Sequence, residues 1–275
     1  MLLGQHWDNI QLIFNFSRTM KTNHQTLLQI VNHVIQQHPE LAETIRGLAD
    51  RKLTETEAQS LSATEIFSSI YKNGLWGKSN DPSQPYFSGS GSHNQAVTSV
   101  YISAVSDFLQ CLPQLPTVLD LGCGDFTIGS QLRKFCKTYI ACDIVPDLIA
   151  FNKQKYSALD VDFRVLDLIT DPLPQADVLF IRQVLQHLSN SQILQLIPKI
   201  PGNFSWLVLT EHLPLNSKFT HNIDQSSGHH IRLEKHSGVV LTSPPFNLDI
   251  AQEEILCQAR SGQGIVNTTV YRLRT

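Results

Sequence analysis

The sequence predicts an α/β fold, with a helical N-terminal region followed by a mostly parallel sheet whose last strand is antiparallel. From residue 116 onward, short apolar runs alternate with stretches of helical periodicity, which is typical of repeated strand–helix–strand units. The last two apolar runs differ, because only Gly-Gln-Gly at 262–264 separates them. They are expected to pair as an antiparallel hairpin.

Residues 1–75 are expected to form a helical region. Between Thr22 and Tyr71 the apolar residues recur at the spacing of amphipathic helices. Pro39 fits the first turn of a helix, and Thr54 and Thr64 fit N-caps. The chain has two methionines, Met1 and Met20, and a start at Met20 is an open alternative.

Residues 76–115 are expected to form a Gly/Ser-containing lid segment and a lead-in helix. The segment carries Trp76, Tyr86 and Phe87, and a pure linker rarely contains three aromatic residues. The stretch 94–112 then has the periodicity of one amphipathic helix. If this helix packs beside the first strand, the Gly/Ser turn lies over the end of that strand.

The third predicted unit, residues 116–275, contains the sheet. Its strands are expected at 117–122, 138–145, 161–169, 176–184 and 205–212, and in the hairpin 253–261 with 266–275. Helices are expected at 126–135, 146–155 and 189–200. The insertion 213–248 is long and polar at its start, and loops of that length usually bind ligands or are disordered. We expect an acceptor-binding lid there.

Composition narrows the classes of partner. The 275 residues include 21 Lys and Arg against 24 Asp and Glu, so a broad cationic face for DNA is not expected. No run of about 18 apolar residues occurs, so no membrane span is expected. A small-molecule or protein partner is therefore favoured.

The cysteine pattern favours a cytoplasmic protein with reduced thiols. The five cysteines form no Cys-x-x-Cys pair and no grouping with His at zinc-site spacing. His229 and His230 are adjacent, but no further ligand follows at a recognisable spacing, so no metal is expected.

The glycine turn after the first strand of this unit, "VLDLGCGDFTIG", narrows the ligand. A phosphate-binding P-loop requires a lysine that this turn lacks. A dinucleotide fingerprint requires a third glycine, and Phe126 and Thr127 occupy that part of the turn. The NAD interpretation is weakened without being excluded.

Three aspartates at successive strand ends indicate a nucleoside with an amino-acid tail. Asp120, just before the glycines, suits a cationic ammonium better than a diphosphate. Asp143 ends the next strand, where a carboxylate accepts hydrogen bonds from both ribose hydroxyls. Asp167 ends the third and suits an adenine amino group.

Together, "VLDLGCGDFTIG", "YIACDIVPDLI", "VLDLI", "DVLFIRQVLQHLS" and the closing hairpin resemble the class I S-adenosylmethionine-dependent methyltransferase domain over residues 116–275. This resemblance implies a Rossmann-like, seven-stranded sheet with the last strand antiparallel. It also implies that Gly122 and Gly124 approach the methionine part, that Asp143 holds the ribose, and that Asp167 and Leu168 frame the adenine.

A narrower resemblance is to a poorly described bacterial small-molecule methyltransferase subgroup. The segments that carry it are "WGKSNDPSQPYFSGSGS", "IRQVLQHLS" and "NIDQSSGHHIRLEKHSGVVLTSPPFNL". Gln183 replaces the acidic residue of that pattern, and Phe126 stands where many relatives have glycine. "SPPF", at 243–246, superficially resembles a motif of DNA amino-methyltransferases, but it follows the fifth strand of the sheet rather than the fourth.

The expected site residues fall into three groups. The expected cofactor-binding residues are Asp120, Gly122, Cys123, Gly124, Asp143, Ile144, Asp167, Leu168, Arg182, Gln183, Ser88 and Ser90. The candidates for the catalytic base are His187, after strand four, and His212, at the end of strand five. The expected substrate-binding residues are Trp76, Tyr86, His187, Asn222, Asp224 and Arg232.

The predicted function is transfer of a methyl group from S-adenosylmethionine to an oxygen or nitrogen of a small molecule. Two alternatives stay open. One is a protein or RNA methyltransferase, although the sequence offers no basic stripe. The other is a non-catalytic binding module that keeps the cofactor fold, which Gln183 and the missing third glycine favour.

Overall fold

The computed structural model describes residues 61–274, of which residues 62–274 belong to one compact unit. The helices predicted before residue 61 and the alternative start at Met20 lie outside the described residues, and the domain boundaries stay predictions. The sheet has seven strands in the order β3-β2-β1-β4-β5-β9-β8. Its strands are β1 (Thr117–Leu121), β2 (Thr138–Asp143), β3 (Asp162–Val165), β4 (Val178–Arg182), β5 (Trp206–Pro214), β8 (Ile250–Ser261) and β9 (Gly264–Leu273).

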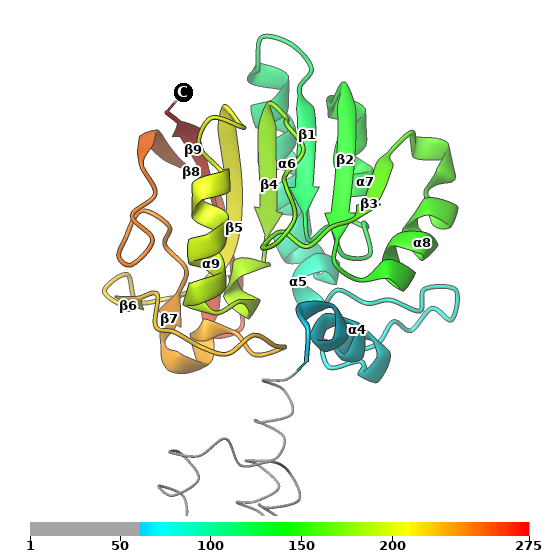
Figure 1. The fold of residues 1–275 in the computed structure, drawn as a ribbon, viewed down its shortest axis with the longest axis horizontal. Helices are drawn as coiled ribbons and strands as arrows, with labels where there is room; N and C mark the ends of the chain where they lie inside the picture. Colours follow the sequence, from blue (N-terminus) through cyan, green and yellow to red (C-terminus); the bar gives the residue numbers. More distant parts are fainter. Residues whose placement is uncertain (1–60, 275) are drawn as a thin grey trace, which may run out of the picture. The chain divides into compact units, whose positions relative to one another are not determined.

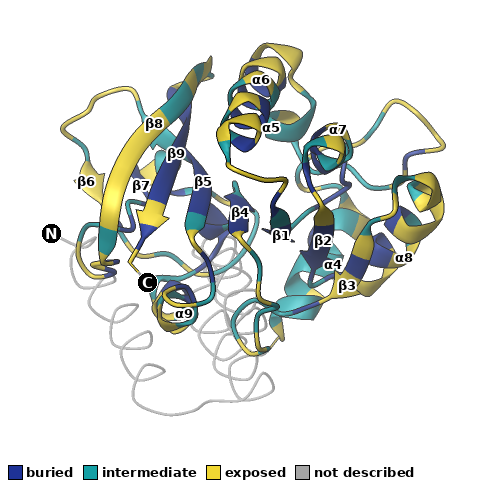
Figure 2. Ribbon diagram, turned by 90° about the horizontal axis from the view of Figure 1, so that it is seen from above, coloured by how far each residue is buried: buried dark blue, intermediate teal, exposed yellow. Residues whose placement is uncertain are grey.

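The strand directions confirm the predicted fold class. β1 to β5 run parallel to one another, and β9 is antiparallel to both β5 and β8. Buried side chains form two clusters, one on each face of the sheet. Figure 2 shows the central strands buried between helices on the two sides, whereas the edge strand β8 is largely exposed.

The helices divide between these faces. α6 (Gln95–Cys111), α7 (Gly129–Leu132) and α8 (Pro146–Lys155) contribute to one cluster, and α9 (Asn190–Leu196) contributes to the other. α4 (Ala63–Asn73) and α5 (Ser90–His93) lie across the carboxyl ends of the parallel strands (Figure 1). The described residues also form five short 3-10 helices: η2 (Arg133–Phe135), η3 (Ser157–Leu159), η4 (Leu185–His187), η5 (Ile197–Lys199) and η6 (Arg232–Lys235).

Several local predictions are corrected. The N-cap of α4 is Ser62, which forms a capping box with Glu65, and Thr64 lies inside the helix. The helix expected at 126–135 shortens to α7 and η2, because Phe126 adopts φ 59° and extends the glycine turn. β3 ends at Val165, so Asp167 lies in the loop that follows.

The insertion 213–248 has an ordered course. It contains the short parallel pair β6 (Thr220–His221) and β7 (Ser237–Gly238), together with η6. Val239, Leu241, Phe246 and Leu248 belong to the buried cluster that α9 covers. Its second half is therefore part of the hydrophobic core.

Candidate functional site

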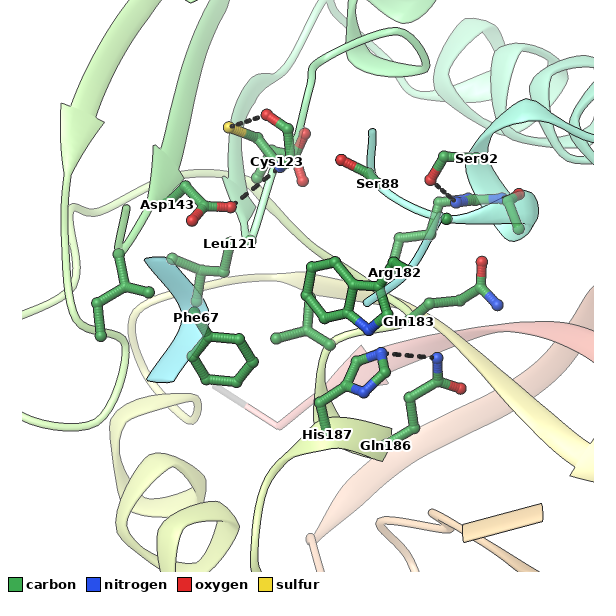
Figure 3. A pocket seen from close by; sticks show the side chains of 18 of the residues that line it. Phe67, Ser88, Ser92, Leu121, Cys123, Asp143, Arg182, Gln183, Gln186 and His187 are labelled. Carbon is green, nitrogen blue, oxygen red and sulfur yellow. Dashed lines mark hydrogen bonds between the residues drawn. The ribbon is translucent and has the colours of Figure 1, made fainter. Parts of the chain in front are cut away.

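A cavity of about 440 Å³ lies at the carboxyl ends of β1, β2 and β4. α4, residues 88–92, η4 and the insertion form its other walls. We call the part around Gly122, Gly124 and Asp143 the glycine-turn end. The part around Phe67, Trp76, Gln186 and His187 is called the η4 end. Figure 3 shows Asp143 and Cys123 in the first part and Gln186 and His187 in the second.

The glycine turn requires glycine at two positions. Gly122 has φ 73°, and a Cβ there would lie 2.4 Å from Cγ2 of Val184. Gly124 has φ 56°, and its Cβ would lie 2.4 Å from Oγ of Ser88. A side chain at either position combines an unfavourable backbone region with a steric overlap. The main chain of the turn therefore forms the cavity wall directly, with Cys123 between the two glycines.

Asp143 lies beside this turn and is buried. Its Oδ2 accepts a hydrogen bond from Gly124 N at 3.1 Å, and its Oδ1 accepts one from Val145 N at 3.1 Å. Burial raises the pKa of Asp143 to about 6, although these backbone hydrogen bonds oppose the shift. Ile144, the next residue, also lines the cavity. A carboxylate placed this way retains free lone pairs for a ligand's hydroxyl groups.

Asp120 is a second buried carboxyl in the cavity lining. It accepts a hydrogen bond from the Tyr139 hydroxyl at 2.9 Å. Burial raises the pKa of Asp120 to about 7, against the effects of Tyr139 and Arg182. A cationic group bound here would favour the ionised form of Asp120.

Asp167 and Leu168 line the cavity beyond β3. Oδ1 of Asp167 accepts a hydrogen bond from Ile169 N at 2.8 Å, which fixes the carboxylate in a tight turn. The structure thus brings all three predicted aspartates to one cavity, although they follow three different strands.

Ser88 and Asp125 join the lid segment to the glycine turn. Ser88 N donates to Asp125 Oδ2 at 2.9 Å, and Asp125 N donates to Ser88 Oγ at 2.8 Å. His93 adds a 2.7 Å contact to the same carboxylate. Burial raises the pKa of Asp125, but the hydrogen bonds from His93 and Ser88 outweigh it and hold that pKa below its ordinary value. Sequence reasoning missed Asp125, although its place directly after the glycines was a signal.

Arg182, at the end of β4, fixes the other end of the lid segment. Its guanidinium donates to Gly91 O at 2.6 Å and to Ser92 Oγ at 3.1 Å. The guanidinium carbon lies 4.8 Å from the centre of the Tyr101 ring, within cation–π range. Gln183 follows with φ 55° and also lines the cavity, as does Ser90.

His187 lies at the η4 end with a defined tautomer. Its Nδ1 lies 3.1 Å from Gly228 O and 3.2 Å from His230 O, both in the insertion. Carbonyl oxygens only accept, so Nδ1 carries the proton and Nε2 holds the lone pair. This lone pair accepts a hydrogen bond from the Gln186 side-chain amide, whose nitrogen lies 3.2 Å away. Burial lowers the pKa of His187 to about 4, so its imidazole is neutral at pH 7.

Comparison with known proteins adds family evidence. The family model described as a methyltransferase domain matches residues 118–201. No curated protein matches the sequence. Among solved structures, the chain is similar to the N-methyltransferase NodS from Bradyrhizobium japonicum WM9, solved with S-adenosyl-L-homocysteine. Identity is 16%, the match covers 76% of this chain and 100% of that one, and the TM-score is 0.54.

Two further solved structures match this chain with lower TM-scores. Human N-acetylserotonin methyltransferase matches at 16% identity over 78% of this chain and 61% of that chain, with a TM-score of 0.49. Magnesium protoporphyrin IX methyltransferase from Synechocystis PCC 6803 matches at 15% identity over 77% and 98%, also with a TM-score of 0.49. This chain thus spans less than two thirds of the human enzyme.

The family match spans β1 to η5, and the NodS likeness shows the same fold over most of the described residues. Residues 118–201 match a methyltransferase domain, and the described part of the chain has the fold of class I S-adenosylmethionine-dependent methyltransferases. The predicted methyltransferase class is thereby confirmed. The narrower subgroup and the role of each site residue stay predictions.

The second candidate base of the methyltransferase domain, His212, also lines the cavity. Its Nε2 lies 3.0 Å from Ser261 O and therefore carries the proton, so a base at this position would use Nδ1. Burial lowers the pKa of His212. The choice between His187 and His212 stays a prediction.

Three predicted substrate-binding residues of the insertion lie outside the cavity lining. Arg232 is fully buried, and its guanidinium donates to the carbonyls of Leu185, Leu188 and Ile223. Asn222 and Asp224 likewise bond main-chain groups, at Val240 and Asn190 among others. Arg232 thus fastens the insertion to η4, Asp224 bonds the first residue of α9, and Asn222 bonds within the insertion. Their roles in substrate binding stay predictions.

Tyr86 is also absent from the cavity lining, and Tyr71 occupies the wall instead. The Tyr86 ring packs at 5.8 Å from Tyr71 and at 5.5 Å from Phe151, behind the wall. Trp76 lines the cavity as predicted, with its ring 5.0 Å from that of His187. Sequence reasoning missed Tyr71, whose spacing on α4 gave no signal beyond an amphipathic helix.

No group of three or more His, Cys, Asp or Glu in residues 61–274 has the arrangement of a metal site. None of the helices in this range is both long and apolar enough to cross a bilayer.

Proposed function

We propose that this methyltransferase transfers a methyl group from S-adenosylmethionine to an oxygen or nitrogen of a small molecule. The observation that carries the proposal is the buried carboxyl of Asp143, hydrogen-bonded to Gly124 N in a turn that admits no side chain at Gly122 or Gly124. Such a cradle lets main chain and carboxylate approach a nucleoside together.

The residues of the glycine-turn end fit each part of this cofactor. Asp143 would accept from the ribose hydroxyls, and Asp120 would pair with the ammonium group. Asp167 and Leu168 would frame the adenine. The hydroxyls of Ser88 and Ser90 would donate to the carboxylate. Once bound, the cofactor supplies an activated methyl group on its sulfonium.

At the η4 end the chain positions the acceptor and receives its proton. His187 is neutral and holds its lone pair on Nε2, so it can act as a general base once the acceptor replaces the Gln186 amide that donates to this atom. Walls from α4 and the insertion enclose this end, so it suits a small acceptor that excludes water when bound. Holding the acceptor oxygen or nitrogen in line with the methyl group supplies much of the rate acceleration.

Calorimetric titration with S-adenosylmethionine, S-adenosylhomocysteine and NAD tests the proposal. We expect micromolar binding of both sulfur nucleosides, none of NAD, and at least about a hundredfold loss in Asp143→Ala, because two hydrogen bonds to a charged acceptor disappear. Asp107→Ala is the matched control, since Asp107 is exposed on α6 and lies outside the cavity lining. Binding without turnover on any small molecule would instead favour the non-catalytic module.

A further inference from the structure

The η4 end of the cavity is lined by aromatic rings. Phe67 and Tyr71 project from α4, and their rings lie 6.2 Å and 5.1 Å from that of Trp76. The Trp76 ring in turn lies 5.0 Å from His187. Phe67 and His187 both lie at the cavity in Figure 3. Aromatic walls of this kind favour a flat apolar ligand, by stacked and edge-on contacts.

The charges in the lining disfavour an acidic ligand. Arg182 is the only Lys or Arg among the described residues that line the cavity, and it bonds Gly91 and Ser92. The carboxylates of Asp120, Asp143 and three other residues face it or its rim. A carboxylate or phosphate on the acceptor would enter without a cationic partner, and burying such a charge is costly.

The hydrogen-bonding groups at the η4 end also discriminate between classes of acceptor. His187 Nε2 is an acceptor, because Nδ1 holds the proton, and the Gln186 amide nitrogen 3.2 Å away is a donor. Gln186 Oε1 is buried and has no hydrogen-bond partner in the described part of the chain. A hydroxyl placed here replaces the hydrogen bond between the two side chains, because it donates to Nε2 and accepts from the amide. A carboxylate has no proton to donate, and an ammonium has no lone pair with which to accept.

We propose that the methyl acceptor is an uncharged aromatic hydroxyl compound whose hydroxyl binds between His187 Nε2 and the Gln186 side-chain amide. This inference rests on the proposed function and names the substrate class of the same site. The ring lies against Trp76 and Phe67, and the hydroxyl oxygen points toward the glycine-turn end.

The transfer step involves the acceptor hydroxyl, the methyl group of S-adenosylmethionine and the imidazole of His187. The acceptor oxygen forms the new bond to the methyl carbon, while the electron pair of the carbon–sulfur bond stays on sulfur. The hydroxyl proton moves to Nε2 of His187 and then to solvent. The products are a methyl ether and S-adenosylhomocysteine.

The strength of the base explains why an aromatic hydroxyl is preferred to an alkyl one. Burial lowers the pKa of His187 to about 4, so this imidazole is a weak base. Proton transfer from a phenol, with a pKa near 10 as in tyrosine, is far less uphill than transfer from a group like water, near 15.7.

A matched set of four probes tests the inference: 4-ethylphenol, 2-phenylethanol, phenylacetate and 2-phenylethylamine. Each is titrated calorimetrically into the full chain saturated with S-adenosylhomocysteine. We expect 4-ethylphenol to bind at least about tenfold more tightly than phenylacetate or 2-phenylethylamine, since unpaired buried polar groups penalise the wrong ligand. With S-adenosylmethionine, only 4-ethylphenol should yield a methyl ether, identified by mass spectrometry.

Equal or tighter binding of the acid or the amine would overturn the inference, as would binding of none of the four at millimolar concentration. Failure of the proposed function has a different signature, because S-adenosylhomocysteine itself would then not bind. A protein that binds S-adenosylhomocysteine but prefers phenylacetate would refute only the acceptor class.

Substitutions at the η4 end test whether methylation can be changed without changing the affinity for S-adenosylhomocysteine. His187→Gln should lower the rate of 4-ethylphenol methylation about a hundredfold, as loss of a general base does, and leave the affinity for S-adenosylhomocysteine unchanged. Trp76→Phe should retain most 4-ethylphenol affinity, and Trp76→Ala should lose about tenfold. The exposed Leu194→Ala on α9 is the control and should change neither quantity. Unaltered methylation in His187→Gln would contradict the role of Nε2.

Discussion

The glycine-turn end and the η4 end of the cavity are built in opposite ways. The first is formed by main chain and carboxylates that follow β1 and β2 directly, within 27 residues of sequence from Val118 to Ile144. The second is assembled from α4, the turn at Trp76, η4 and the insertion, which are far apart in sequence. The first end thus follows from the fold, whereas the second depends on long-range side-chain contacts.

The largest expected effect comes from adding a methyl group at the glycine-turn end. Gly124→Ala places Cβ 2.4 Å from Ser88 Oγ, in a backbone region with φ 56°. The clash must displace Ser88 and break its reciprocal hydrogen bonds to Asp125. We expect at least about a hundredfold loss of S-adenosylhomocysteine affinity by calorimetry, because both the turn and the lid segment move.

Gly202→Ala is the control for that substitution. Gly202 also has positive φ, 78°, but no atom lies within 4 Å of its added Cβ. It therefore carries the backbone strain without the steric overlap, and affinity should stay within about twofold of wild type. If Gly124→Ala bound normally, main-chain approach would not define this end.

The contrast explains how much of the site the sequence could predict. The predicted residues Gly122, Gly124, Asp120, Asp143 and Asp167 were found because each lies at or just after the carboxyl end of a predicted strand. The carboxyl ends of parallel strands meet at one edge of a sheet, so proximity follows from topology. The seven-stranded order itself was expected from the family resemblance and is confirmed.

The η4 end resisted prediction for a physical reason. Arg232 and Asp224 are polar residues in a long loop, and polarity alone does not distinguish a ligand contact from a buried main-chain contact. Arg232 is fully buried and bonds carbonyls of η4 across more than 40 residues of sequence. Only the folded register of the insertion decides that role, and no local pattern encodes it.

An intermediate effect is expected from pH and should be confined to the glycine-turn end. Burial raises the pKa of Asp143 to about 6 and that of Asp120 to about 7. If the cofactor requires both carboxylates ionised, binding near pH 6.5 must release about one proton, and affinity should fall about twentyfold from pH 8 to pH 6.

Calorimetry in two buffers of different ionisation enthalpy measures that proton release directly. The sign follows from the raised pKa values: the free protein holds protons on Asp143 or Asp120 below pH 7, and the bound state does not. At pH 8.5 the release should be close to zero. Proton uptake, or an affinity that is constant between pH 6 and pH 8, would show that these carboxyls do not serve as ionised ligands.

The smallest effect tests whether the insertion positions His187 without touching the cofactor. Arg232→Lys retains a cation beside Glu211, whose charge opposes the loss of Arg232 ionisation caused by burial. It removes the planar fork that donates to Leu185 and Leu188, on either side of His187. The η4 turn that carries His187 then loses hydrogen bonds that fix its position. We expect about a threefold to tenfold loss in kcat/KM for 4-ethylphenol.

Affinity for S-adenosylhomocysteine should be unchanged in Arg232→Lys, because no atom of Arg232 lines the cavity. Arg133→Lys is the matched control: Arg133 also donates to main-chain carbonyls, of Asp160 and Cys136, but away from η4. Arg133→Lys should change neither the affinity for S-adenosylhomocysteine nor kcat/KM for 4-ethylphenol. Equal losses of cofactor affinity and of kcat/KM in Arg232→Lys would mean that the two ends are mechanically coupled, and the division between a fold-determined end and an assembled end would fail.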